Sequence, residues 1–188
     1  VKSVNLFVYA GGLTAVDEGV TSDDAMIMTK TFKATDIGDI DQDFSGDQKT
    51  NLISETYYIG EKGDEIADYS LSIKQDSDHV VKSVNVFYYE STDTTVIGSR
   101  ASMATTEDAM VATRTYKTTD ISLIDHTYDP DALPEADTTT NLISETYYEG
   151  EKGDEIAYYS YSIKQNSDHV VKSVNLFVYA GGLTAVDE

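Results

Sequence analysis

Acidic side chains gather in two polar stretches, and these residues are the ones best suited to chemistry. The first stretch reads DIGDIDQDFSGD and the second reads IDHTYDPDALPEAD. The candidate ligands in them are Asp39, Asp41, Asp43, Asp125, Asp129 and Asp131. Calcium binds six to eight oxygen ligands, so both stretches are candidate calcium sites. The EF-hand pattern is absent, because the positions for Gly and Glu, counted from Asp39, hold Phe44 and Thr50. An ordinary solvated loop is the favoured interpretation, and calcium is the alternative.

Three other polar arrangements fall short of a catalytic site. Residues 77–79 read Ser-Asp-His, but neighbouring side chains of an extended chain point to opposite faces, whereas a triad must converge. Acidic pairs at residues 64–65 and 154–155 follow glycine turns, where we expect carboxylates to be solvated. Residues 60–63 lack the spacing and the Lys-Ser/Thr ending of a phosphate-binding loop. We therefore predict no catalytic residue, no cofactor other than possible calcium, and no enzyme activity.

Composition excludes several partners. The 188 residues include 34 acidic and 13 basic side chains, for a net charge of −21, and no Cys. Without Cys there can be no disulfide and no Cys-ligated metal. Nucleic acid would be repelled, because binding it depends on neutralising phosphates. No apolar run reaches the length of about 18 residues that a membrane span needs, so we expect no membrane insertion. Because the chain begins with Val, we expect it to belong to a longer or processed polypeptide.

Internal repeats dominate the sequence. Residues 51–90 and 141–180 differ at seven of 40 positions, and residues 1–18 return unchanged as residues 171–188. The motif VKSVN begins at residues 1, 81 and 171, so the intervals are 80 and 90 residues. The ten extra residues fall in polar, turn-rich stretches, where added length costs little. We divide the chain into a first repeat (1–80), a second repeat (81–170) and the start of a third (171–188).

Alternation of apolar and polar residues predicts strands inside each repeat. In residues 81–89, Val84, Val86 and Tyr88 share one face, which is the period-two pattern of a half-buried strand. Residues 156–163 alternate in the same way. A short helix over residues 23–33 is the weaker alternative to a strand there. Residues 38–50 and 122–140 are rich in Asp, Gly, Pro and Thr, so we expect connections that are too polar for the core.

Each repeat therefore reads as two β-hairpins. One hairpin is marginal in water, so hairpins must bury their faces on their neighbours. The predicted fold is all-β, with tandem antiparallel hairpin repeats in a solenoid-like or filamentous array. A string of β-sandwich domains is the alternative. An immunoglobulin-like sandwich needs about seven strands, and each repeat offers only four clear ones.

Serial Tyr-bearing hairpins such as SETYYEGEKGDEIAYYSYSI resemble the giant tandem-repeat surface proteins of bacteria. They are more distantly similar to the tyrosine–aspartate hairpin repeats that wind into spiral β shells, although the Gly-Arg-Leu step of that family is missing here. The resemblance implies an extracellular, repetitive β scaffold and assigns no catalytic residue.

The expected function is structural: a fibre, sheath or cell-surface stalk whose partner is the neighbouring repeat or subunit. An open sheet edge invites pairing, and the large negative charge should limit nonspecific association. The alternative is an adhesin that binds a glycan or protein, possibly with calcium, through loops 11–22 and 91–106, because variable loops on a constant scaffold often bind ligands. The fourteen Tyr fit either cross-strand ladders, which we favour, or stacking on saccharides.

Overall fold

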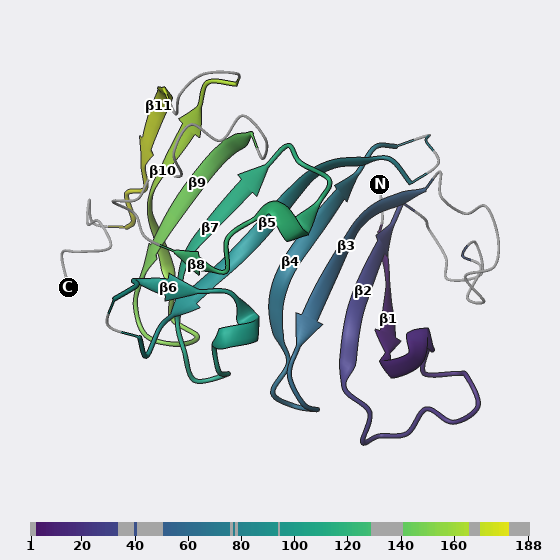
Figure 1. The fold of residues 1–188 in the computed structure, drawn as a ribbon. Coiled ribbons are helices and arrows are strands. Elements are labelled where there is room, and N and C mark those ends of the chain that lie inside the picture. The colour runs from purple at the N-terminus through teal and green to yellow at the C-terminus, as the bar shows by residue number, and fades with distance from the viewer. Residues whose placement is uncertain are drawn as a thin grey trace. The chain divides into compact units, whose positions relative to one another are not determined.

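The computed structural model describes residues 3–33, 40, 51–75, 77, 79–93, 95–128, 141–165 and 170–180. These residues form eleven strands and only three single-turn 3₁₀ helices, and all the strand pairs are antiparallel (Figure 1). The prediction of an all-β chain is confirmed. The segment for which a short helix was the alternative contains strand β2, Met26–Phe32.

The chain divides into two compact units, Val1–Ser83 and Val84–Glu188. The first contains β1 (Val4–Tyr9), the 3₁₀ helix η1 (Ala10–Gly12), β2, β3 (Leu52–Ile59) and β4 (Ile66–Ile73), and these strands pair in chain order. The second unit contains most of β5 and the remaining elements. They are β5 (Val81–Glu90), β6 (Gly98–Ser99), η4 (Ala101–Met103), β7 (Met110–Tyr116), η5 (Ile121–Leu123), β8 (Thr127–Tyr128), β9 (Leu142–Glu149), β10 (Ile156–Ile163) and β11 (Val171–Leu176).

In the second unit the strand order is β5-β7-β9-β10-β11, and the short strands β6 and β8 pair with each other beside β5. The two units use the same registers. Leu6 lies opposite Lys30 in β1–β2, and Val86 lies opposite Arg114 in β5–β7, which are the same repeat positions. The pairs β2–β3 and β7–β9 also match, as do β3–β4 and β9–β10, and each matched pair has its register shift at the same place. Insertions between the copies have therefore changed loops and left strand pairing unchanged.

Glycine sets the hairpin turn between β9 and β10. Gly150 has a φ of 117°, a conformation that L-residues rarely adopt. A Cβ atom at this position would lie 2.7 Å from the carbonyl oxygen of Asp154. Gly60, between β3 and β4, has a φ of 130° and would meet the carbonyl of Asp64 in the same way. Both turns thus need glycine for its backbone conformation and for its lack of a side chain.

The core of the first unit includes a residue from a stretch expected to lie outside it. Five buried side chains form the main cluster: Leu6, Phe32, Ile40, Leu52 and Ile73. Ile40 belongs to the polar stretch 38–50, so the prediction that this stretch is too polar for the core is wrong at that residue. An apolar side chain can thus join the core even when its neighbours in the sequence are polar.

In the second unit, too, residues from a stretch predicted to be too polar for the core are buried. Val84 and Val86 are fully buried, and Ile124 and Tyr128, from the stretch 122–140, are buried as well. The ring of Tyr128 lies 5.3 Å from the ring of Tyr88, measured between centroids. The prediction for this stretch is therefore wrong at both residues. Part of the connection, including β8, is structural and packs beside the sheet.

Candidate functional site

The predicted calcium ligands are mostly outside the described residues. Asp39, Asp41, Asp43, Asp129 and Asp131 all fall there. Asp125 is described, and it is exposed. Its backbone carbonyl accepts a hydrogen bond of 3.2 Å from the hydroxyl of Tyr88. Among the described residues, no three His, Asp or Glu side chains come together in a group that could hold a metal ion. A calcium site in the two acidic stretches stays a prediction.

Elsewhere, acidic loop residues act as local ties. The carboxylate of Asp24 accepts hydrogen bonds from the backbone N (2.6 Å) and the hydroxyl (2.9 Å) of Thr21. These two hydrogen bonds lower the pKa of Asp24. Thr105 and Asp108, which occupy the same positions in the second repeat, make the same contacts at 2.7 and 2.9 Å. The acidic character of these loops thus has a structural cause that requires no ligand.

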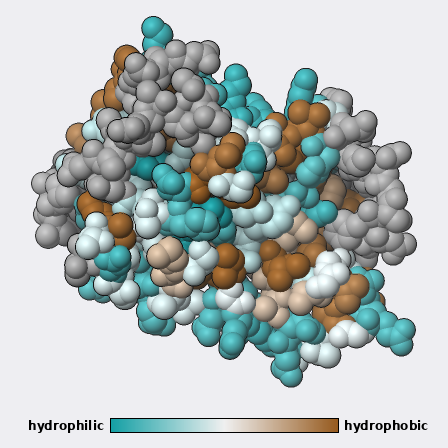
Figure 2. Space-filling model, viewed as in Figure 1, coloured by the Kyte–Doolittle hydropathy of each residue, from teal (hydrophilic) through white to brown (hydrophobic). Residues whose placement is uncertain are grey.

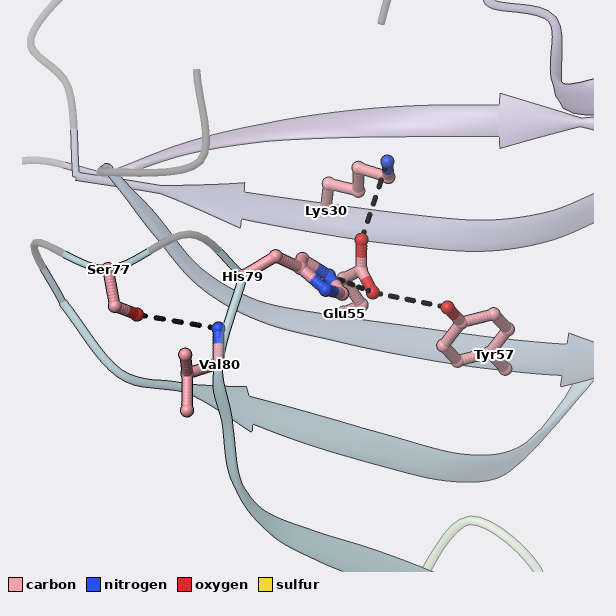
Figure 3. Close-up of polar contacts among 6 residues, drawn as sticks. All are labelled: Lys30, Glu55, Tyr57, Ser77, His79 and Val80. Atoms are coloured by element: carbon pink, nitrogen blue, oxygen red, sulfur yellow. Dashed lines mark hydrogen bonds and ion pairs between the residues drawn. The ribbon is translucent and has the colours of Figure 1, made fainter. Parts of the chain in front are cut away.

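Ser77 and His79 do not act together. The hydroxyl of Ser77 donates to the backbone carbonyl of Lys74 at 2.5 Å, which closes the turn before β5. The ring of His79 instead extends to Glu55, with Nε2 at 3.0 Å from Oε2 (Figure 3). Asp78 lies outside the described residues. The two described side chains have separate partners, in keeping with the turn that the sequence predicts.

Glu55 is the centre of a polar cluster in the first unit. Its side chain is buried in β3, and Lys30 of β2 places Nζ 3.4 Å from its Oε1. On the other oxygen it receives the hydroxyl of Tyr57 at 3.1 Å and the ring of His79 (Figure 3). Burial, and then the neighbouring Glu55 carboxylate, raise the pKa of Tyr57. Both carboxylate oxygens are occupied, so the cluster joins β2, β3 and the turn before β5.

Glu145 holds the equivalent place in the second unit and is enclosed more completely. Arg114 of β7 donates from Nε to Oε2 at 2.8 Å, and Tyr128 of β8 donates to Oε1 at 2.9 Å. The guanidinium carbon of Arg114 also lies 4.5 Å from the centre of the Tyr128 ring, within cation–π range. Both charged side chains are buried. This centre joins β7, β8 and β9.

Neither of these two centres is predicted from the sequence, although the sequence contains a signal for them. The Tyr-rich strand LISETYY contains one Glu in both copies, Glu55 and Glu145. The second residue of the segments TKTF and TRTY is basic in both copies, Lys30 and Arg114. A charge repeated inside a strand needs a partner, because burying it unpaired is expensive. The pairing of Lys30 with Glu55, and of Arg114 with Glu145, follows only once the strand register is known.

The acidic residues after the hairpin turns are also partly structural. Glu65 accepts hydrogen bonds from the backbone N of Met26 (3.0 Å) and of Gly63 (2.9 Å). Glu155 accepts from Met110 at 3.1 Å and from its own hairpin turn. The hydrogen bond from Met26 is the main cause that lowers the pKa of Glu65. Glu65 and Glu155 are partly exposed, and each also ties its turn to a neighbouring strand, β2 for Glu65 and β7 for Glu155.

Tyrosine rings stack across strands. Tyr147 and Tyr159 lie opposite each other in β9 and β10 with ring centroids 4.2 Å apart. Tyr57 and Tyr69 form the same pair in β3 and β4, at 4.5 Å. These four rings match the ladder interpretation, in which aromatic pairs stabilise a sheet.

The edge strand β11 carries an exposed apolar surface. Residues 171–179 repeat residues 1–9, which include β1, and β11 pairs with β10. Leu6 and Val8 of β1 are only 8% and 0% exposed, whereas the matching Leu176 and Val178 are 56% and 60% exposed. Hydrophobic side chains are visible at the surface where β11 lies (Figure 2). An identical segment is therefore buried at one position and exposed at the other.

Comparison with protein-family models, curated proteins and solved structures finds no match to this chain. In the part of the chain that the structure describes, no helix has the length and apolar character to cross a membrane.

Proposed function

We propose that this chain is a structural repeat protein of an extracellular fibre, sheath or cell-surface stalk. In this proposal the hairpins form one tandem array, and the function is to extend, assemble and resist force. The observation that carries it is the identical register of three strand pairs in the two units. A scaffold that adds strands by a fixed rule can be lengthened without a new fold.

Two further features support a scaffold. Within each unit the long strands follow one path of neighbouring antiparallel pairs, which favours a hairpin array over a string of β-sandwiches. Two buried carboxylates, Glu55 and Glu145, pair with basic side chains of neighbouring strands. In this reading the chain is not an enzyme, and its partner is its own repeat.

Chains of increasing repeat number test the proposal. We would express one, two and three copies of residues 1–170, each followed by residues 171–188, and image them by electron microscopy with small-angle X-ray scattering. The expected result is a rod that lengthens by the same increment with every block. Compact particles, or increments that vary, would overturn the array. Protease shaving of intact producing cells tests the location, because a surface stalk is cut while the cells stay whole.

An adhesin is the second candidate, and one cavity favours it. A surface cavity of about 540 Å³ in the first unit is lined by Tyr9, Val20, Thr21, Lys62 and Glu65, among others. Four of its lining residues come from loop 11–22, where the sequence predicts variable binding contacts: Ala15, Val20, Thr21 and Ser22. Saturable glycan or protein binding that Lys62→Glu removes would establish this function. Lys152→Glu is the matched control, because Lys152 has the same repeat position.

A further inference from the structure

The first unit holds an amine against a buried carboxylate on two neighbouring strands. Lys30 of β2 is the register partner of Glu55 in β3. Nζ of Lys30 lies 3.4 Å from Oε1 of Glu55, and the two side chains are 18% and 4% exposed. An ammonium and a carboxylate differ from an amide by one molecule of water. The strand pairing therefore holds two groups that can react with each other in contact, which removes the entropic cost of bringing them together.

Two groups that can carry protons lie at the other oxygen of this carboxylate. The hydroxyl of Tyr57 donates to Oε2 of Glu55 at 3.1 Å, and Nε2 of His79 lies 3.0 Å from the same atom (Figure 3). The side chain of His79 is 38% exposed, so its ring can exchange protons with solvent while it contacts Glu55. The amine is thus at one carboxylate oxygen and the proton-carrying groups are at the other, as acyl substitution with a general acid requires.

The backbone of His79 adopts an uncommon conformation. Its φ is 53°, in the left-handed region that few residues other than glycine occupy. The turn around it is closed by the hydroxyl of Ser77, which donates to the carbonyl of Lys74, and by the backbone N of His79, which donates to the carbonyl of Ser77 at 2.9 Å. Backbone outliers of this kind cluster at functional sites. Here the strained turn places the ring on a carboxylate that is 24 residues away in the chain.

We propose that Lys30 and Glu55 condense in the folded chain to an isopeptide bond, which joins β2 to β3 covalently. Nζ of Lys30 attacks the carboxyl carbon Cδ of Glu55, the bond between Cδ and Oε2 breaks, and Oε2 leaves as water. The ammonium gives up two protons and Oε2 gains two, and His79 transfers them. The reactants are one ion pair and the products are one neutral amide and one water, so the balance needs no oxidant, reductant or cofactor.

Burial favours the amide, because the ion pair carries a desolvation cost that a neutral amide does not have. The second unit provides a natural comparison, since Arg114 and Glu145 occupy the equivalent positions with Nε 2.8 Å from Oε2. A guanidinium stays protonated in proteins and does not attack a carboxyl group. The chain therefore contains one centre that can condense and one matched centre that cannot. This chemistry belongs to the first unit alone and does not depend on the fibre proposed above.

Mass spectrometry of the intact, folded chain tests the bond. After prolonged incubation in neutral buffer, the expected mass is lower by one water. Trypsin should then release residues 3–33 and 50–62 as one linked product, because an amidated Lys30 resists cleavage. The tryptic peptides that contain Arg114 and Glu145 should stay separate. An unchanged mass, or a lost water that fragmentation places within a single peptide, would overturn the proposal.

Three variants assign the reacting groups. Lys30→Arg gives the first unit the ion pair of the second and should keep the full mass, and so should Glu55→Ala, which removes the carboxyl carbon. His79→Asn tolerates the left-handed backbone but cannot transfer protons, so it should slow the loss of water by about 100-fold while the circular dichroism stays that of the wild type. A lost water in Lys30→Arg would refute the bond to Lys30, and an unchanged rate in His79→Asn would refute the role of His79.

Discussion

Glu145 depends on its neighbours, because an ionised carboxylate inside a sheet is stable only when it is paired and hydrogen-bonded. Arg114 and Tyr128 supply that environment, and each in turn depends on Glu145. In the first unit, Glu55 is paired with Lys30, whose side chain is 18% exposed and therefore retains access to solvent. The two centres are equivalent in sequence position and different in how completely they are enclosed.

Because the two centres are enclosed to different degrees, we expect removal of the carboxylate charge to destabilise the fold by different amounts. Glu145→Gln leaves the Arg114 charge buried without its carboxylate, and we expect a loss of about 3–5 kcal/mol in the free energy of unfolding. Glu55→Gln should cost less, since Lys30 can turn toward water. Urea unfolding followed by circular dichroism measures both values. Equal losses for the two variants would contradict the difference in enclosure.

Buried tyrosines predict a distinctive alkaline transition. Burial is the largest cause of a raised pKa at Tyr57, Tyr88, Tyr116, Tyr128, Tyr147 and Tyr159. A folded-state pKa above the ordinary value of 10.0 gives stability that is complete below that value. The stability is lost as the pH rises toward the folded pKa.

We therefore expect tyrosinate absorbance to be incomplete at about pH 11 while the circular dichroism is still native. The remaining absorbance should appear together with unfolding at higher pH. Denatured chain in urea is the control, in which all the Tyr titrate together. Complete ionisation with an intact sheet would show that these rings are accessible.

At the scale of elements, the hairpin turn between β9 and β10 requires glycine for two different reasons: a positive φ, and the lack of space for a Cβ atom. Gly150 and Gly153 both have positive φ, yet a Cβ at Gly153 meets open space, whereas one at Gly150 meets the carbonyl of Asp154. Gly153→Ala should cost about 1 kcal/mol, from the backbone conformation alone. Gly150→Ala should cost more, because the turn must also move. Thermal unfolding of both variants checks the order, and a larger loss for Gly153→Ala would contradict it.

The sequence predicted those elements that have a local pattern. Alternation identified β5 and β10, and it favoured a strand over a helix for β2. Ile40 and Tyr128 were missed because each stands among polar residues without a period-two pattern, and nothing nearby indicates which strand it covers. The Glu145 centre was missed because Arg114 is 31 residues away, and only the register brings the two together.

At the scale of the whole molecule, a net charge of −21 predicts a response to salt. Self-repulsion destabilises a compact state, and salt screens it, so NaCl should raise the melting temperature. Comparing the melting temperatures in CaCl₂ and MgCl₂ at equal ionic strength distinguishes charge screening, which is the same in both salts, from specific binding of calcium. Equal melting temperatures in both are expected if the acidic stretches are ordinary loops, and a rise specific to CaCl₂, reversed by EDTA, would establish the calcium alternative.

Identity between residues 1–18 and 171–188 also bears on how such a protein can change its length over generations. A genetic crossover between the coding sequences of these two segments joins one copy to the other at equivalent positions of the same segment. The product gains or loses 171 − 1 = 170 residues, and every remaining strand keeps its partner and its register. Heritable variation in length therefore comes in whole blocks that fold as before, and selection can adjust reach without testing a new structure.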